Sequence, residues 1–282
     1  LPYMQMISEF APAKINLALH LVGQKRNGYH LLDSIVSFVN IGDKISVEPG
    51  KSGELKVAGP FAKDLPKSNH NLVVKAARSF SNIKLSQITL EKNIPVTSGI
   101  GGGSADAAAT VRLFSKLYNK PVLPIEKLIS LGSDVPVCMQ KGIVRMMGVG
   151  EKLINLSPAP KVGILLVNPR KALSTAEVFN AVKEKNNSGL NLQDSIEKSL
   201  NSWFDWINSM RNDLTTSAID LIPDIRLILD KLNTCEGARV VRMSGSGATC
   251  FALFEDFDLL QDAKVKIMTE CPSFWCEAGE LI

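Results

Sequence analysis

The stretch that decides the fold is Pro95-Val-Thr-Ser-Gly-Ile-Gly-Gly-Gly-Ser-Ala-Asp-Ala-Ala-Ala109, in which a glycine-dense loop runs directly into an alanine-rich segment. Glycines can adopt positive φ angles and leave room for a ligand beside the main chain, because they have no Cβ. Alanine is the strongest helix former, so a helix is predicted from Ser104. The unpaired N–H groups and the positive dipole end of that helix would face the same point as the loop amides. The stretch therefore predicts a binding site for an anion such as a nucleotide phosphate.

Two other kinds of phosphate loop fit this stretch poorly. The loop of nucleoside triphosphatases ends in Gly-Lys-Ser/Thr, whereas Gly103 is followed by Ser104 and Ala105. The dinucleotide fingerprint requires a short strand-to-helix turn and an acidic residue about 20 residues later. Here Tyr118-Asn-Lys-Pro121 lies at that distance and predicts a turn. A flexible linker is a third interpretation, but strong helix formers do not usually follow a linker at once.

Composition limits the class of protein. The 282 residues are enough for two domains, and 45% apolar content supplies a core for each. No apolar run is long enough to cross a bilayer and no basic segment leads into an apolar one near the first residue, so neither membrane anchoring nor export is expected. An odd number of cysteines in mostly apolar surroundings predicts reduced thiols and a cytoplasmic location. These are Cys138, Cys235, Cys250, Cys271 and Cys276.

The charge balance gives no indication of a nucleic-acid partner. The net charge is +4, but the basic residues are spread along the chain and aromatic residues make up only 6% of it. A nucleic-acid binder usually concentrates Lys and Arg with aromatic residues on one surface. A mild positive charge suits a small phosphorylated substrate equally well.

Apolar periodicity predicts an α+β chain with two domains. Alternation around residues 15–21 places Lys14 and Asn16 on the same face of a first strand. Further strands are predicted at residues 31–39, 44–48, 88–92, 143–147, 163–167, 240–243, 249–254 and 274–277. Helices are predicted at residues 71–80, 104–117, 125–131, 174–185, 196–210, 217–232 and 259–269. The composition break at Ser157-Pro-Ala-Pro160 predicts domains 1–157 and 158–282.

Three motif segments resemble one superfamily. Pro12-Ala-Lys-Ile-Asn-Leu-Ala-Leu19, Pro95 to Ala109 and Arg242-Met-Ser-Gly-Ser-Gly-Ala-Thr-Cys250 are similar to its N-terminal, phosphate and C-terminal glycine motifs. It is the superfamily of galactokinase, homoserine kinase, mevalonate kinase and phosphomevalonate kinase, the GHMP kinases. The resemblance covers nearly the whole chain. It implies an N-terminal ATP-binding domain of ribosomal-protein-like type, a C-terminal ferredoxin-like domain, and an active site in the cleft.

Two further segments narrow the resemblance to one branch of the superfamily. Asn27-Gly-Tyr-His-Leu-Leu32 and Leu131-Gly-Ser-Asp-Val-Pro-Val137 look like the branch that phosphorylates the 2-hydroxyl of a cytidine-diphosphate-linked methylerythritol in the non-mevalonate isoprenoid pathway. This implies ATP and Mg²⁺ as cofactors and that small molecule as the partner, in a monomer or weak homodimer. The metal ligands are left open. Homoserine or mevalonate kinase activity is the nearest alternative, and neither needs to hold a cytosine. A regulator that binds nucleotide without catalysis is another, but Lys14 and Asp134 together argue against it.

The resemblance implies catalytic roles for Lys14 and Asp134. Phosphoryl transfer needs neutralisation of the spreading phosphate charge and a place for the hydroxyl proton. Asp134 can accept that proton, and Lys14 can keep Asp134 ionised and stabilise charge on the transferred group. Asn16 would orient the acceptor end of the substrate. Considered alone, Asp134 could merely shape a turn and Lys14 could be a solvated strand residue.

The resemblance also implies a base site and an ATP site. Tyr29 and His30 would meet the cytosine, by stacking and by hydrogen bonding respectively. Phe179 aligns with an aromatic residue on the other side of the base, although its spacing equally suits a helix core. The other implied substrate contacts are Thr175, Gly245 and Gly247, and the two glycines could instead form a tight hairpin. The implied ATP-binding residues are Pro95, Val96, Thr97, Ser98, Gly99, Ile100, Gly101, Gly102, Gly103, Ser104 and Ala105, with Asn71, Leu72 and Lys92 as looser adenine-site matches.

The chain departs from the family pattern in three places. Asn27 replaces a usual Asp, Ala105 replaces a frequent second serine, and Met146-Met147 replaces a usual Ala-Arg pair. An Asn-Gly pair makes the same turn as Asp-Gly, and the loss of the serine leaves the backbone cradle intact. Any contact from the missing arginine is in doubt.

Overall fold

The computed structural model describes residues 6–52, 55–65, 71–80, 86–191 and 199–282. The chain divides into two units that are interleaved in sequence. Unit 1 comprises Leu1–Ala13, Gly42–Val96 and Gly101–Gln140, and unit 2 comprises Lys14–Ile41, Thr97–Ile100 and Lys141–Ile282. Unit 2 therefore includes residues 14–41, 97–100 and 141–157 together with the C-terminal half of the chain.

Two long strands pass from one unit to the other. β1 (Ile7–Gln24) pairs with β2 (His30–Ser52), and both are longer than the sequence pattern predicts. The predicted strands at residues 31–39 and 44–48 are in fact parts of β2. The strand does not break at Gly42, because this glycine lies within β2 with its main chain against Ala11 of β1. A Cβ on Gly42 would be 2.1 Å from the carbonyl oxygen of Ala11.

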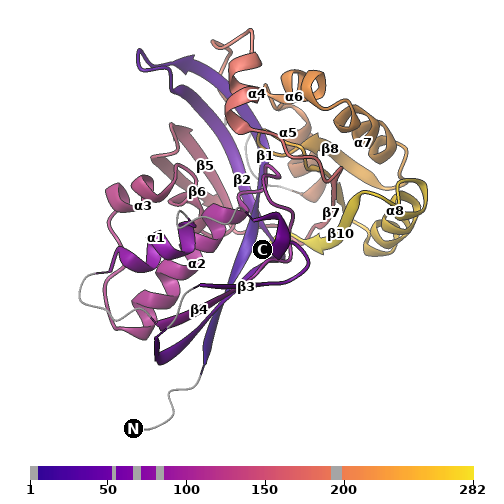
Figure 1. Ribbon diagram of the computed structural model, residues 1–282. Coiled ribbons are helices and arrows are strands. Elements are labelled where there is room, and N and C mark those ends of the chain that lie inside the picture. Colours follow the sequence, from indigo (N-terminus) through magenta and orange to yellow (C-terminus); the bar gives the residue numbers. More distant parts are fainter. Residues whose placement is uncertain (1–5, 53–54, 66–70, 81–85, 192–198) are drawn as a thin grey trace. The chain divides into compact units, whose positions relative to one another are not determined.

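In unit 1, strands and helices pack around an alanine-rich helix. β4 (Ser86–Glu91) is antiparallel to β2, with Lys44 opposite Glu91, and β3 (Lys56–Ala58) is parallel to β4. α1 (Leu72–Arg78) packs against α2 (Gly102–Leu117), as Figure 1 shows. The small side chains of α2 are buried and allow this close approach. The remaining elements are α3 (Ile125–Leu131) and the 3₁₀ turns Ala62–Asp64 and Val137–Met139.

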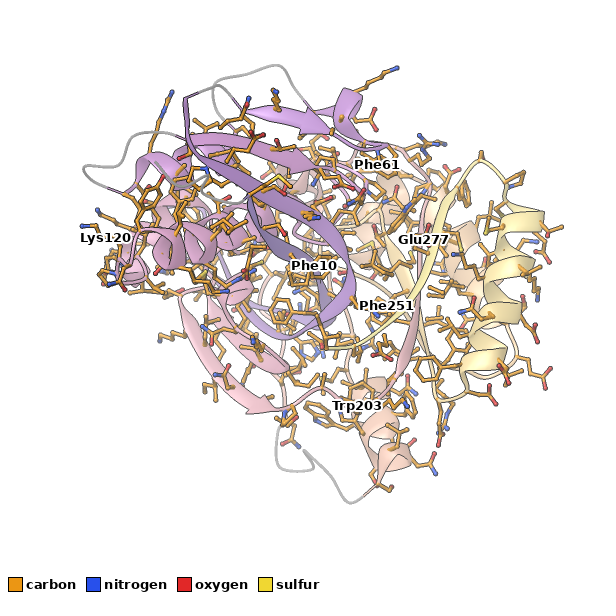
Figure 2. All side chains as sticks on the ribbon, turned by 90° about the horizontal axis from the view of Figure 1, so that it is seen from below. Phe10, Phe61, Lys120, Trp203, Phe251 and Glu277 are labelled. Carbon is orange, nitrogen blue, oxygen red and sulfur yellow. The ribbon has the colours of Figure 1, made fainter. Side chains whose placement is uncertain are left out.

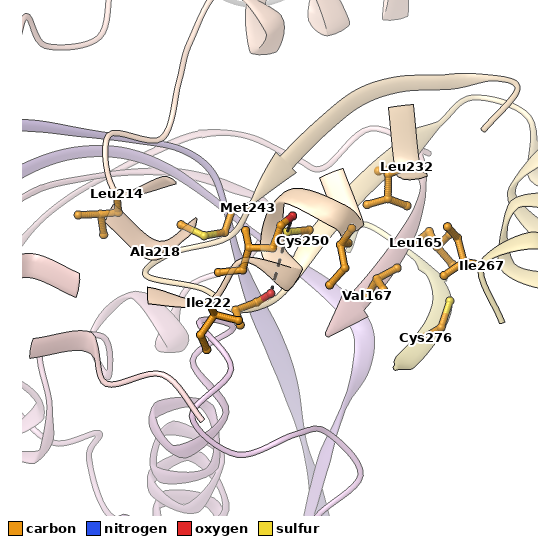
Figure 3. Packing of buried hydrophobic residues seen from close by; sticks show 14 of the residues in the cluster. Leu165, Val167, Leu214, Ala218, Ile222, Leu232, Met243, Cys250, Ile267 and Cys276 are labelled. Atoms are coloured by element: carbon orange, nitrogen blue, oxygen red, sulfur yellow. Dashed lines mark hydrogen bonds between the residues drawn. The ribbon is translucent and has the colours of Figure 1, made fainter. Parts of the chain in front are cut away.

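Unit 2 contains a four-stranded antiparallel sheet in the order β10-β7-β9-β8. Its strands are β7 (Gly163–Asn168), β8 (Ala238–Met243), β9 (Cys250–Phe254) and β10 (Trp275–Glu280). The helices α7 (Asp224–Asn233) and α8 (Phe257–Glu270) pack on this sheet. Figure 3 shows the core between these helices and the sheet, where Leu165, Val167 and Cys250 are fully buried. This burial is the main stabilising contribution to unit 2.

Other elements of unit 2 lie outside that sheet. β5 (Ile143–Gly148) pairs with the first part of β2 and with β6 (Lys152–Ser157), a strand that the sequence did not predict. The remaining helices are α4 (Thr175–Ala181), α5 (Leu200–Asn208) and α6 (Thr215–Leu221). Figure 2 labels Trp203 on α5, a residue that is 5% exposed and forms a T-shaped ring pair with Phe204.

Several predicted helices differ from the structure. The helix predicted at residues 217–232 is wrong as a single element, because Pro223 separates α6 from α7 and Ile222 before it is extended, with φ −133° and ψ 93°. The helix predicted at 174–185 ends at Ala181, because Val182 is extended, with φ −69° and ψ 126°. Farther along, Asn187 N donates to Leu21 O of β1 at 2.8 Å. The start of the helix predicted at 196–210 lies outside the described residues, and α5 accounts for most of the rest.

Two expectations from composition can be compared with the structure. All five cysteines are buried, and none of them forms a disulfide in the structure. None of the described helices combines the length and apolar character that a membrane span needs.

Candidate active site

The first turn of α2 has the features that an anion site requires. Gly101 precedes the helix with φ 66° and ψ 20°, a left-handed conformation that favours glycine. The first helical hydrogen bond of this turn runs from Ala105 N to Gly101 O at 2.8 Å, so the N–H groups of residues 102–104 precede it. A Cβ on Gly103 would meet nothing closer than Leu72 Cδ1, at 3.7 Å. The helix begins two residues earlier than predicted, and its first N–H groups are of the kind that bind the phosphates of ATP.

Residues 97–100 of the glycine loop belong to unit 2, where they contact the two other motif segments. Lys14 N donates to Ile100 O at 2.9 Å. The Ser244 hydroxyl accepts from Asn16 N and donates to Gly99 O, each at 3.1 Å. Segments far apart in sequence are thereby joined through one buried hydroxyl group, so Ser244 links all three motifs.

The glycines of two motifs pack directly on each other. A Cβ on Gly99, which has φ +75°, would lie 2.6 Å from the carbonyl oxygens of Gly247 and Ser244. A Cβ on Gly245 would lie 2.6 Å from Gly99 O. Close packing of main chains, and not only ligand access, is therefore a reason for glycine at these positions.

The hairpin interpretation of the C-terminal glycine motif is confirmed. β8 and β9 pair with Met243 opposite Cys250. Ser244 N donates to Thr249 O at 2.9 Å, and Gly247 N donates to Ser244 O at 3.0 Å. Substrate contacts by Gly245 and Gly247 stay predictions.

We expect Gly99→Ala to destabilise the protein more than Gly28→Ala. Gly28 also has a positive φ, +88°, but nothing lies within 4 Å of a Cβ placed there. Its substitution should cost only the left-handed conformation, about 1–2 kcal/mol. At Gly99 the clash with two carbonyl oxygens adds about 1–3 kcal/mol. Urea unfolding of both variants checks this, and equal losses would contradict the role of close packing at Gly99.

Lys14 is buried and part of a hydrogen-bond network, so it is not the solvated strand residue that its isolated sequence suggests. Its side chain is 4% exposed, and Nζ donates to Asn16 Oδ1 at 2.7 Å. Asn16 Nδ2 donates to Ser34 Oγ at 2.8 Å, and the Ser34 hydroxyl donates to Ala18 O. Lys14 and Asn16 share a face of β1, as predicted. Because both polar atoms of its amide are engaged, Asn16 fixes the ammonium of Lys14 in this structure, and its contact with substrate stays a prediction.

Asp134 lies in unit 1, in the turn between α3 and the 3₁₀ turn Val137–Met139. Its main-chain oxygen accepts from Cys138 N at 3.1 Å, and the residue is half-buried. A Cβ on Gly132, two residues earlier, would lie 3.7 Å from Ser104 Oγ. Asp134 therefore shapes a turn, and that turn lies beside the first turn of α2.

A buried ion cluster that sequence reasoning missed lies next to the same helix start. Lys92 Nζ forms a short ion pair with Asp43 Oδ2 and donates to Asp106 Oδ2 at 3.1 Å. Lys92 is 2% exposed, and its main-chain N–H donates to Ala58 O at 2.8 Å. A direct contact between its ammonium and adenine is therefore not supported. An aspartate within the alanine run 105–109 was the sequence signal for this cluster, because a buried carboxylate needs a partner.

The three groups of this cluster influence one another's ionisation. Burial raises the pKa of Asp106 to about 8, with Lys92 opposing and Asp43 adding to the increase. Burial lowers the pKa of Lys92, but the two carboxylates outweigh it and the net pKa of Lys92 is raised. The carboxylate of Asp43 accepts from two main-chain groups as well, Asn93 N at 2.6 Å and Ile94 N at 3.2 Å.

The residues predicted to meet a base are in unit 2. Asn27 Oδ1 accepts from Tyr29 N at 3.3 Å, so Asn27 forms the turn expected of an Asn-Gly pair, and Tyr29 is 64% exposed. The rings of His30 and Phe179 lie 5.0 Å apart with a 35° tilt, and Phe179 also packs against the unit 2 core. Burial, followed by the charge of Lys185, lowers the pKa of His30, which favours a neutral imidazole.

The remaining predicted residues have local structural roles. Asn71 is the N-cap of α1, and its Oδ1 accepts from Val73 N at 2.9 Å. The hydroxyls of Thr175 and Ser246 are hydrogen-bonded at 2.9 Å, which joins the start of α4 to the C-terminal glycine motif.

Comparison with known proteins identifies the family. Residues 71–144 match the family model of the GHMP kinases N-terminal domain, and residues 191–272 match that of the GHMP kinases C-terminal domain. The 4-diphosphocytidyl-2-C-methyl-D-erythritol kinase of Cereibacter sphaeroides is 41% identical over 98% of this chain and 99% of its own length. The enzyme of that name from Ruegeria pomeroyi is 42% identical over 98% of this chain and 99% of its own length.

Solved structures agree with this family. A crystal structure of 4-(cytidine 5'-diphospho)-2C-methyl-D-erythritol kinase superposes with a TM-score of 0.80 at 29% identity, over 98% of this chain and 99% of that one. Homoserine kinase from Cytophaga hutchinsonii shares the fold, with a TM-score of 0.69 at 17% identity over 100% and 96% of the two chains. The chain is therefore an α+β protein of the GHMP kinases and belongs, among them, to the family of 4-diphosphocytidyl-2-C-methyl-D-erythritol kinases.

Proposed function

We propose that the protein transfers the γ-phosphoryl group of ATP to the 2-hydroxyl of 4-diphosphocytidyl-2-C-methyl-D-erythritol, which yields the 2-phosphate and ADP in the non-mevalonate isoprenoid pathway. The observation that carries this proposal is the identity of about 40% to kinases of that name over nearly the whole of both chains. Features within each unit support it: the start of α2 and the half-buried Asp134 in unit 1, and the buried Lys14 in unit 2, are groups that phosphoryl transfer uses.

ATP supplies the phosphoryl group, and the first turn of α2 would hold its phosphates. The N–H groups of residues 102–104 and the positive end of the helix dipole are suited to that charge. Asn71 is the N-cap of α1 and Leu72 is its first residue. Leu72 Cδ1 is the atom nearest to a Cβ placed on Gly103, which supports an adenosine position on this side of unit 1. We place Mg²⁺ with the nucleotide, since this ion is usually bound through substrate phosphates and one or two carboxylates and needs no protein cage.

Asp134 and Lys14 would carry the chemistry. The 2-hydroxyl oxygen attacks the γ-phosphorus while Asp134 takes up the hydroxyl proton. The bond between the γ-phosphorus and the bridging oxygen breaks in line with the attack, and ADP leaves. Lys14, oriented by Asn16, stabilises the charge that spreads over the transferred group. The hydrogen bond from Lys14 Nζ to Asn16 Oδ1 fixes the ammonium before substrate binds, so no reorganisation is needed during the reaction.

Tyr29, His30 and Phe179 would recognise the cytosine. The exposed ring of Tyr29 is available for stacking, worth about 1–3 kcal/mol. His30 Nδ1 has no hydrogen-bond partner among the described residues, and the edge of a base would supply one if binding exposes this buried atom. These residues favour a cytidine substrate over homoserine or mevalonate, neither of which carries a base.

A coupled ADP-release assay with three acceptors tests the substrate. We expect turnover with 4-diphosphocytidyl-2-C-methyl-D-erythritol and none above background with homoserine or mevalonate. Tyr29→Ala should raise KM for the cytidine substrate about 5- to 150-fold, the effect of losing one stacking contact, and leave KM for ATP unchanged. Turnover only with homoserine or mevalonate would overturn the substrate assignment.

The expected setting of the enzyme is part of the proposal. Buried cysteines without disulfides suit a cytoplasmic location. We also propose that the protein is a monomer or weak homodimer. We propose sequence domains at 1–157 and 158–282, because one family match falls on each side of this boundary.

A further inference from the structure

The buried cluster of Asp43, Lys92 and Asp106 distributes its hydrogen bonds unequally. The Asp43 carboxylate accepts from three donors: the ammonium of Lys92 and the main-chain N–H groups of Asn93 and Ile94. Among the described residues, the Asp106 carboxylate accepts only from Lys92, through Oδ2. Its Oδ1 is buried and has no partner among the described residues, and the residue is 2% exposed.

This inequality determines which carboxyl group holds a proton. With all three groups ionised, the buried cluster would carry one positive and two negative charges. A buried carboxylate oxygen without a donor is strongly unfavourable, and a neutral carboxyl group avoids most of that cost. The carboxylate of Asp43 is already satisfied by its three donors. The proton therefore belongs on Asp106, in agreement with the increase of its pKa to about 8 by burial.

The cluster lies directly under the start of α2. A Cβ on Gly102, the first residue of that helix, would be 3.2 Å from Lys92 Nζ and 3.7 Å from Asp43 Oδ2. Asp43 also holds Asn93 and Ile94, immediately before the glycine loop, and Lys92 reaches Asp106 just after it. Both ends of the loop are thus anchored to one cluster, whose net charge acts on the turn where an anion would bind.

We propose that Asp106 is a positioning residue that stays protonated in the active enzyme, where it ties α2 to Lys92 and keeps the cluster under the phosphate-binding turn free of net charge. This role for ATP binding rests on the function proposed above. If Asp106 lost its proton, a negative charge within the first two turns of α2 would oppose the field of the helix dipole and weaken phosphate binding.

Few other charges face Asp106. Lys92 and Asp43 are the groups whose charges act on it. Elsewhere on α2, Arg112 and Lys116 are paired with Glu9 on β1. On α1, which packs against α2, the charged residues Lys75 and Arg78 are exposed. A pH effect that disappears with Asp106 can therefore be assigned to this cluster.

The first test measures stability against pH and needs no activity. Asp106→Asn keeps an oxygen acceptor for Lys92 but cannot titrate. A carboxyl group with a raised folded pKa binds a proton in the folded chain at pH values where the unfolded chain has lost it, so stability falls as pH rises between the two pKa values. We expect the unfolding constant of the parent, divided by that of Asp106→Asn, to increase about tenfold per pH unit from about pH 5 to pH 7 and to level off above about pH 8.

A matched control and a measurement on the parent keep this test decisive. Asp262→Asn makes the same chemical change on an exposed position of α8, so its unfolding curve should stay parallel to that of the parent. Parallel curves for Asp106→Asn would overturn the proposal. If Asp106→Asn does not fold, infrared difference spectra of the parent decide: a protonated-carboxyl band that is lost between about pH 7 and pH 9.5 supports the proposal, and no such band at pH 7 overturns it.

The second test measures nucleotide binding directly. The Kd of a non-hydrolysable ATP analogue should rise about two- to fivefold more in the parent than in Asp106→Asn between about pH 7 and pH 9.5, the effect of one charge near a helix terminus. The same rise in both proteins would overturn the positioning role. If neither protein binds the analogue, the proposed ATP site fails, while the stability curves still decide the protonation of Asp106.

Discussion

Asp134→Asn should lower kcat about 10²–10⁴-fold and leave the affinity for ATP nearly unchanged, because it removes the group that accepts the hydroxyl proton. Asparagine has the shape of aspartate but cannot take up a proton at neutral pH. The nucleotide phosphates would be held by the main chain at the start of α2, which this substitution leaves intact. Steady-state ADP release gives kcat, and calorimetric titration with a non-hydrolysable ATP analogue gives the affinity.

The turn around Asp134 should survive this change. It depends on a main-chain bond, from Cys138 N to Asp134 O at 3.1 Å, and asparagine favours turns as aspartate does. Ser133→Ala is the matched control, since it alters an exposed neighbour in the same turn and should retain normal kcat. A near-normal kcat for Asp134→Asn would show that another group takes the proton.

The sequence predicted the local elements around the site well. The helix after the glycine loop, the strand that carries Lys14 and the Asn27–Gly28 turn each depend on residues close together in sequence. Glycine at 101 and alanines from 105 onward set the start of α2 through local conformational preference. Such signals are readable because the interactions that determine them are local.

Contacts between distant segments could not be predicted in the same way. The glycine at 99 suggested a ligand cradle, but its Cβ position is filled by the main chain of residues 244–247. Lys92 loosely matched an adenine-site position of the family, but it is paired with Asp43 on a neighbouring strand. In both cases the deciding partner is far along the chain, and no local pattern identifies it. The helix break at Pro223, by contrast, could have been predicted from the sequence, because proline disfavours helix at the preceding residue.

The three motif segments share one physical arrangement in unit 2. Lys14, the loop residues 97–100 and the hairpin at 244–249 are joined by main-chain bonds and by the hydroxyl of Ser244. The ammonium of Lys14 is therefore held by a strand whose position is fixed at Lys14 N and Asn16 N. Positioning of this kind is what makes a single charge effective in phosphoryl transfer.

Lys14→Met should lower kcat about 10²–10³-fold, the usual loss when one group that stabilises transition-state charge is removed. Methionine keeps an unbranched chain of similar length in a site that is 4% exposed, so the packing of β1 should be maintained. Asn16→Ala should give a smaller loss of kcat, because it leaves the ammonium in place but removes the acceptor at 2.7 Å that orients it.

Lys44→Met is the matched control for this prediction, because it makes the same change at an exposed position of β2 and should leave kcat and stability close to those of the parent. Steady-state kinetics on all three variants, with thermal unfolding to confirm their folding, distinguishes a catalytic from a structural effect. If Lys14 acts on the transferred group, kcat falls in Lys14→Met while KM for both substrates changes little, since the interaction strengthens only in the transition state. If Lys14 serves only to complete the network of Asn16 and Ser34, Lys14→Met and Asn16→Ala should lower thermal stability alike and leave kcat within about threefold of the parent.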